Sequence, residues 1–176
     1  MNAIDKQSGF STLEILVSVA IFAFILLAII SFVFWLNITN LKSKADANTL
    51  ESARTILDTI SYEIKGAKSV YTPTTTANQL SLETLRYLPT GEAVTFIDFF
   101  LCGTPSTDIC LKKEGQNPVI LNSDKVKVTG LSFAQITNNT SASVKISLTV
   151  ENKNPTNETS QSSSVTLDST VSLRSY

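Results

Sequence analysis

The sequence predicts an α+β fold, in which one long N-terminal α-helix packs on a C-terminal head of antiparallel β-sheet. Three observations support this prediction. No glycine or proline occurs from Phe10 to Lys65, so a helix can run through the segment without interruption. The first half of that segment is almost entirely apolar, from Ile15 to Leu36. Further along the chain, apolar and polar residues alternate, which is the period of half-buried strands.

Residues 1–9 are a short polar leader, and residues 10–41 are predicted to form a hydrophobic transmembrane helix. As a helix, the apolar run from Ile15 to Leu36 would span about 33 Å, enough to cross the hydrocarbon core of a bilayer. The apolar region of an ordinary signal peptide is shorter, at about 7 to 15 residues. A cleaved signal is disfavoured for a second reason, since the small-residue site Ala45–Ala47 lies well beyond the run.

Glu14 is the only charged residue between Lys6 and Lys42. Drawing a carboxylate towards the centre of a bilayer costs on the order of a few kcal/mol, so we expect Glu14 to have a positively charged partner. A free α-amine at Phe10 would lie about one helical turn away. The alternative is a plain single-pass anchor, in which Glu14 reaches the lipid headgroups.

Residues 42–68 are predicted to continue the helix as an amphipathic segment that enters the head. Apolar residues at spacings of three and four form one stripe: Leu50, Ala53, Leu57, Ile60 and Ile64. Charged residues form the opposite, solvent-facing side: Asp46, Glu51, Arg54, Asp58, Glu63 and Lys65. Gly66, followed by Lys68, is a plausible end of the helix.

Residues 69–176 are predicted to form a β-rich globular head, with one sheet that covers the helix stripe. Strands are expected around Leu80–Leu85, Val94–Leu101, Val126–Phe133, Val144–Val150 and Val165–Leu173. Gly130 is expected to mark a bulge in the third of these. Asn152–Ser163 contains Pro155 and almost no apolar residue, so it reads as a loop.

Cys102 and Cys110 flank a turn-rich segment between two apolar runs. Outside the cytoplasm, a disulfide between them would close a short loop and contribute roughly 2 to 3 kcal/mol of stability. The alternative is a pair of reduced, partly buried thiols. We favour the disulfide, provided that the head is exported.

No catalytic, metal or cofactor site is predicted. The sequence contains no histidine, which excludes Ser-His and Cys-His activation of a nucleophile. Two cysteines without histidine do not make an ordinary four-ligand zinc site. The six glycines form neither a P-loop nor a dinucleotide fingerprint. With a net charge of −1, the chain has no strong field for polyanions, so binding of DNA is possible but unsupported.

The N-terminal pattern resembles the leader of type IV pilin-like proteins, which carry a prepilin-type cleavage and methylation motif. The resemblance rests on the Gly9-Phe10 junction, on Glu14 and on the apolar run that follows. It implies that a prepilin peptidase cuts between Gly9 and Phe10, that Phe10 is N-methylated, and that Glu14 takes part in assembly. It also implies that residues 10–41 become the core helix of a filament.

A second resemblance suggests the class of subunit. The stretch Ala53–Val70 and the closing residues Val171–Arg174 are similar to parts of J-type minor pseudopilins and W-type minor pilins. We therefore expect a structural subunit, and not an enzyme, of a type IV pilus, type II secretion or competence filament. Its partners would be other pilin or pseudopilin subunits, the prepilin peptidase and an inner-membrane assembly platform.

The expected location is the inner membrane, with the head outside the cytoplasm and later in an extracellular or periplasmic filament. The positive-inside rule alone favours the opposite orientation, because Lys42, Lys44 and Arg54 follow the apolar run whereas only Lys6 precedes it. We place the leader in the cytoplasm on the strength of the motif. The rival interpretation is a single-pass, membrane-anchored extracytoplasmic binding protein, whose first candidate surface is Lys112, Lys113, Lys125 and Lys127.

Overall fold

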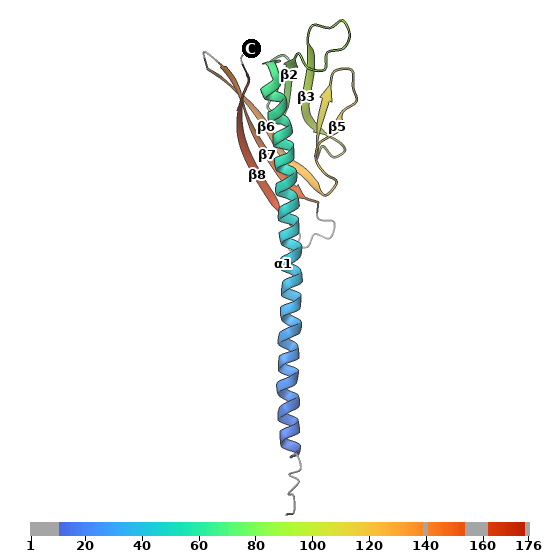
Figure 1. The fold of residues 1–176 in the computed structure, drawn as a ribbon, viewed down its shortest axis with the longest axis vertical. Helices are drawn as coiled ribbons and strands as arrows, with labels where there is room; N and C mark the ends of the chain where they lie inside the picture. The colour runs from blue at the N-terminus through green and yellow to red at the C-terminus, as the bar shows by residue number, and fades with distance from the viewer. Residues whose placement is uncertain (1–10, 139–140, 154–161, 175–176) are drawn as a thin grey trace, which may run out of the picture. The chain divides into compact units, whose positions relative to one another are not determined.

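The predicted α+β layout is confirmed by the computed structural model, which describes residues 11–138, 141–153 and 162–174. The chain divides into two compact units, Met1–Leu41 and Lys42–Tyr176. One helix, α1 (Thr12–Gly66), precedes the strands (Figure 1). The described strands are β1 (Ala67–Val70), β2 (Gln79–Thr84), β3 (Thr95–Cys102), β4 (Asp108–Lys113), β5 (Val119–Ile120), β6 (Val126–Asn138), β7 (Ser141–Asn152) and β8 (Ser164–Ser172).

Helix α1 is continuous through the segment that contains no glycine or proline. It ends at Gly66, two residues before the expected limit at 68, because Ala67–Val70 form β1 and pair with β2. A Cβ atom at Gly66 would meet the guanidinium group of Arg86, the far end of a flexible side chain, which would have to shift.

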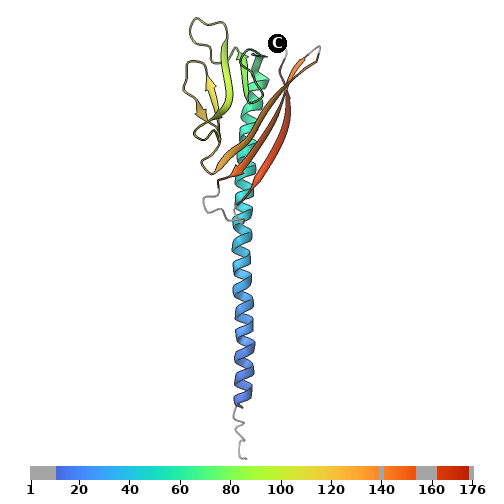
Figure 2. The same cartoon turned by 180° about the vertical axis from the view of Figure 1, so that it is seen from behind.

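The strands form two antiparallel sheets, and the prediction of a single sheet is wrong. One sheet has the order β1-β2-β3-β4-β5, and the other has the order β6-β7-β8. Figures 1 and 2 show the two sheets on opposite sides of the last turns of α1. Two backbone hydrogen bonds join the edge of β6 to loops of the first sheet, from Val128 to Thr107 and from Phe133 to Ala77.

The side chain of Asn122 explains why the sheets separate between β5 and β6. Its Oδ1 atom accepts a hydrogen bond from the backbone N–H of Ile109 at 2.9 Å, where a longer β5 would have continued the ladder. Its Nδ2 atom donates to the backbone oxygen of Val126 at 3.1 Å and to Asp108 Oδ1 at 2.9 Å. Since Asn122 is buried, these bonds fix the turn that directs the chain into β6.

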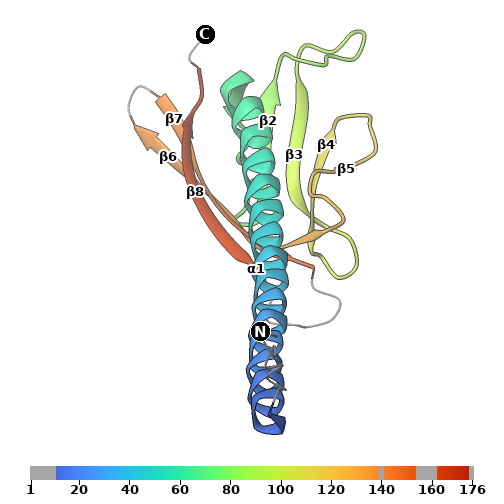
Figure 3. The same ribbon diagram turned by 60° about the horizontal axis from the view of Figure 1, so that its bottom comes forward.

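The stripe on the second half of α1 packs into one hydrophobic core with both sheets. Figure 3 shows the ribbon of this part of α1 between the two sheets. Four of the five predicted stripe residues are buried, and Leu50 is half-buried. The prediction that Glu63 faces solvent is wrong, because its exposed fraction is only 5%. Its position next to Ile64 places it on the core side of the last turn, where it meets Arg86.

The strand predictions hold in outline and differ in detail. The expected bulge at Gly130 is confirmed, since the β6–β7 register shifts between Val128 and Gly130. Leu85 was placed in a strand but follows the end of β2 and is exposed. β7 ends at Asn152 and β8 begins at Ser164, so the predicted loop connects them, although residues 154–161 lie outside the described part.

Candidate functional site

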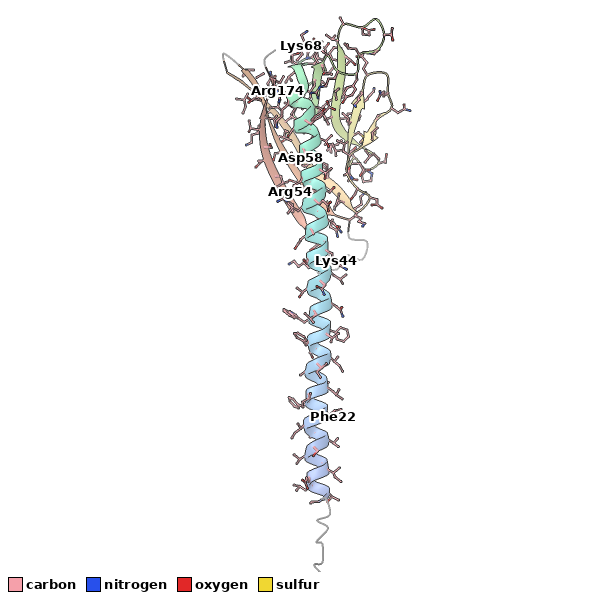
Figure 4. All side chains as sticks on the ribbon, viewed as in Figure 1. Phe22, Lys44, Arg54, Asp58, Lys68 and Arg174 are labelled. Atoms are coloured by element: carbon pink, nitrogen blue, oxygen red, sulfur yellow. A yellow bond between two sulfur atoms is a disulfide. The ribbon has the colours of Figure 1, made fainter. Side chains whose placement is uncertain are left out.

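The first candidate site is the uncovered apolar part of α1. Every residue from Ser11 to Lys44 is exposed. The exposed side chains are large, with Phe24 at 79% and Leu13 and Leu16 at 72%. Figure 4 shows them standing out around the ribbon, with Phe22 labelled. The mean hydropathy reaches 3.0, so this helix is long and apolar enough to cross a membrane.

Three hydroxyl groups in this segment are satisfied within the helix. Ser18 Oγ donates to the carbonyl oxygen of Glu14 at 2.8 Å, and Ser31 Oγ donates to that of Leu27 at 2.9 Å. Thr39 Oγ1 bonds to Trp35 in the same way at 3.0 Å. Each bond removes the cost of placing an unpaired hydroxyl in an apolar environment. These three polar side chains are therefore compatible with a lipid or filament-core setting.

Glu14 lies in the first turn of α1. Its carboxylate makes no hydrogen bond or ion pair with the described residues. The helix begins after Ser11, whose carbonyl oxygen accepts bonds from the N–H groups of Glu14 and Ile15 at 3.0 and 3.3 Å. An acidic residue here also interacts favourably with the helix dipole. Gly9 and Phe10, the predicted processing residues, lie outside the described part of the chain.

One further feature of this site was not predicted. Ser11 and Glu14 have the S-x-x-E spacing of a capping box, in which a serine precedes the first helical residue and a glutamate lies at the third position. Neither side-chain bond of that box is present among the described residues, since Ser11 Oγ and the Glu14 carboxylate make no hydrogen bond there. Glutamine fits the same spacing, so Glu14→Gln removes the charge and keeps the sequence pattern of the helix start.

The predicted disulfide is present between Cys102, at the end of β3, and Cys110, on β4. Their Cα atoms are 5.9 Å apart, and their sequence separation is 8 residues. Cys110 is buried, so one end of the bond is anchored in the core. Gly103 has a φ of 85°, which allows the chain to leave β3 in a tight turn. The bond therefore closes the base of the β3–β4 connection.

The four lysines of the rival binding surface do not act as one group. Lys112 and Lys113 belong to β4 in the first sheet, whereas Lys127 belongs to β6 in the second, and Lys125 precedes it. Lys127 Nζ forms an ion pair with Glu151 at 3.0 Å. Lys113 Nζ lies 3.6 Å from the centre of the Tyr87 ring. With two of the four engaged, they offer little free positive potential to a polyanion.

Lys125 also borders an open groove of about 350 Å³ between α1 and the β5–β6 turn. The groove is lined by Asn48, Glu51, Ser52, Thr55, Leu121, Ser123, Asp124 and Lys125. Its charges are mixed and exposed to solvent. Among the residues that the structure describes, no group of three or more His, Cys, Asp or Glu side chains is arranged to hold a metal ion. The groove therefore has no clear ligand chemistry.

A polar cluster around the buried Glu63 lies at the end of α1 in the head. The carboxylate of Glu63 accepts a hydrogen bond from the Tyr87 hydroxyl at 3.3 Å, and its second oxygen lies 4.0 Å from Arg86 Nη1. That distance exceeds a hydrogen bond, and both atoms are buried without a hydrogen-bond partner among the described residues. The guanidinium also stacks over Tyr62, 4.8 Å from the ring centre. This cluster joins α1 to the β2–β3 loop.

Comparison of the chain with protein-family models, with curated proteins and with solved structures finds no match in any of the three.

Proposed function

We propose that the protein is a structural subunit, a minor pilin or pseudopilin, of a type IV pilus, type II secretion or competence filament. The observation that carries the proposal is the uncovered apolar helix with a single carboxylate at its start. Burying one large apolar side chain is worth about 1.5 to 3 kcal/mol. A helix with so many exposed ones needs lipid or neighbouring helices around it.

Glu14 favours a filament over a simple anchor. A lipid anchor gains nothing from a carboxylate at the edge of its span, whereas a filament of such helices can pair it with an amine. Cleavage between Gly9 and Phe10 would create that amine as the new N-terminus. At about 4 Å and an effective dielectric constant near 20, such a pair attracts by roughly 4 kcal/mol before the cost of desolvation. The charge would then set how neighbouring subunits align.

The head is consistent with a location outside the cytoplasm. Disulfides persist in oxidising compartments and are rare in the cytosol. The Cys102–Cys110 bond therefore supports the orientation with the leader inside and the head outside. In this proposal the protein first stands in the inner membrane as a single-pass precursor, and then passes into the filament through its assembly platform.

The proposal is tested by the N-terminus of the mature protein. We expect protein extracted from membranes of cells that contain a prepilin peptidase to begin at an N-methylated Phe10, as measured by intact mass and N-terminal sequencing. Gly9→Leu should remain uncut, because the peptidase must accept a very small side chain there, and Gly9→Ala is the conservative control. An intact Met1 terminus in the parent protein would contradict the filament proposal and favour a plain single-pass anchor.

A further inference from the structure

In the part of the chain that the structure describes, strand β8 ends the three-stranded sheet with no bulge, proline or covering segment, and Asp168 is its one charged residue. It pairs with β7 over nine consecutive residues without a register shift. Its sequence, SVTLDSTVS, contains no proline, glycine or lysine. Natural proteins usually protect such edges with short strands, bulges, proline, charged side chains, lysine above all, or a covering loop. The strand therefore remains a template for pairing.

The other sheet edges are short or already bonded in part. β1 has 4 residues and β5 has 2, which is too short for an extended ladder. The edge of β6 donates hydrogen bonds to Thr107 and Ala77 of the first sheet. Helix α1 cannot pair with β8, since its backbone bonds are internal. Figure 3 shows β8 at the border of its sheet.

The register identifies which backbone groups of β8 are open. Leu173 N–H donates to Ala142, and Asn152 N–H donates to Ser163, so the odd-numbered residues of β8 bond to β7. The even-numbered residues direct their N–H and C=O groups away from β7. These are Ser164, Thr166, Asp168, Thr170 and Ser172. Among the described residues, no backbone or side-chain partner meets these groups.

The burial pattern shows that the sheet ends before its inner face is fully covered. On β7, Leu148 and Val150 are completely buried. Their partners across the ladder, Leu167 and Val165, are only half-buried although they face the same core. A further strand with apolar residues at alternate positions would cover this face, since side chains alternate between the two faces of a sheet.

One charge selects among possible partners. Asp168 is the only charged residue of β8 and lies at the centre of the five open residues. A second copy that paired with all five by two-fold symmetry would place Asp168 opposite its own copy, which is unfavourable. A strand with a lysine or arginine at that point would pair favourably. The occupant is therefore a different polypeptide segment.

We propose that β8 binds an extended segment of another protein by strand addition, with a basic residue opposite Asp168 and apolar residues facing Val165 and Leu167. Backbone hydrogen bonds supply affinity in this mode of recognition, and the alternating side chains supply specificity. The inference depends only on the head, and it stands whether or not the protein enters a filament.

The test uses the full-length protein in detergent micelles and fluorescent nine-residue peptides that alternate threonine and valine around a central lysine. We expect saturable binding by fluorescence anisotropy, weakened about five-fold or more when the central lysine is replaced by glutamate. Methylation of the central peptide nitrogen should abolish binding, because it removes a donor to the open edge. Equal binding of all three peptides would overturn the proposal.

Two variants locate the site. Thr170→Pro removes an N–H that β7 does not use, so the β7–β8 ladder should persist while peptide binding is lost. Thr170→Ala keeps that N–H and should bind like the parent. If the proline variant does not fold, amide hydrogen exchange in the parent protein shows whether the peptide binds at β8. The N–H groups of the even residues should exchange fast in free protein and slow when the lysine peptide binds.

Three results would contradict the assignment. Slow exchange of the even-numbered amides in the free, monomeric protein would show that the edge is already occupied. A dimer whose interface maps to β8 would show that the occupant is a second copy, against the charge argument. If a folded Thr170→Pro variant still bound the peptide, the binding site would lie on another surface and not on β8.

Discussion

At the residue scale, three carboxylates illustrate how position decides what a charge does. Glu14 has no described partner and stands beside the apolar span. Glu63 is buried against Arg86 and Tyr87. Glu83 is held by Lys68 and Ser69 across two strands. Glutamate thus has three roles in this protein: the proposed assembly, a contact in the core, and the pairing of β1 with β2. Each role predicts a different response to substitution.

Glu14→Gln should reduce incorporation into filaments and leave cleavage and membrane insertion intact. The glutamine keeps the capping position but removes the charge that would meet a neighbour's amine. An uncompensated desolvated amine costs about 3 kcal/mol, which corresponds to roughly a hundredfold loss of incorporation. The measurement is the yield of sheared filaments, with Asp58→Asn, an exposed carboxylate on the same helix, as the control. Equal yields of parent and Glu14→Gln would refute the assembly role.

Arg86→Met should destabilise the head by about 2 kcal/mol, because it leaves the buried carboxylate of Glu63 without a cation. The value lies below that of a fully buried pair, since the Arg86 side chain is 37% exposed. The double variant Glu63→Gln with Arg86→Met should recover about half of the loss. Denaturant unfolding measures both, and Arg54→Met removes an exposed cation as the control. A double variant as unstable as the sum of the two single variants would show that the groups are not coupled.

At the element scale, local bonds fasten the short strands that the sequence specifies weakly. β1 is only 4 residues long and has an irregular register with β2. Lys68 Nζ and Ser69 Oγ each lie 2.7 Å from a different oxygen of Glu83, so two side-chain hydrogen bonds join β1 to β2. The disulfide does the same for β3 and β4. The hydrogen bonds to Glu83 depend on pH, and the disulfide is sensitive to reductant.

The Lys68 and Ser69 hydrogen bonds lower the pKa of Glu83 below its ordinary value. A lowered folded-state pKa stabilises the protein above the ordinary carboxyl pKa of about 4.3, and this contribution is lost as the pH falls through the folded-state pKa. Glu83→Gln should therefore cost about 0.5 kcal/mol at pH 7, a small value because Lys68 is 55% exposed. Urea unfolding at pH 7 and pH 3 should show this cost shrinking at the lower pH. A cost of the same size at both would rule out the Glu83 linkage.

Replacement of both Cys102 and Cys110 by serine should lower the stability of the head by roughly 2 to 3 kcal/mol without abolishing the fold. The closed loop is short, and the core residues of both sheets remain in place. Chemical unfolding of parent and variant measures the difference. Thiol labelling of unreduced, denatured protein should find no free thiol in the parent, and two equivalents would show that the bond is absent in the purified protein.

At the scale of the whole molecule, the sequence was informative wherever one periodic pattern decided the outcome. The long helix followed from the absence of Gly and Pro, and the strands of β6 to β8 followed from strict alternation. The second sheet could not be foreseen, because it depends on the buried hydrogen bonds of Asn122, a polar residue with no periodic signature. Glu63 was misplaced for the same reason, since its partners lie more than 20 residues away in the loop after β2.

The candidate sites also differ in how far a sequence pattern predicts them. The cysteine pair was predictable from its spacing and turn-rich loop, and the structure contains the bond. The open edge of β8 was invisible in the sequence, because alternation predicts a strand but does not say which strands become its neighbours. The processing residues Gly9 and Phe10 rest on the motif alone.

The single core also has a consequence for the order of events during synthesis. The helix stripe from Ala53 to Ile64 shares one cluster with Val171 and Leu173. On the order of 100 residues separate these parts of the chain, so at about 5 to 20 residues per second the ribosome needs roughly 5 to 20 s between them. During that interval the apolar stripe of the helix is not fully buried, because the last core residues have not yet been made. The head therefore closes around its helix only once the last strand has been made.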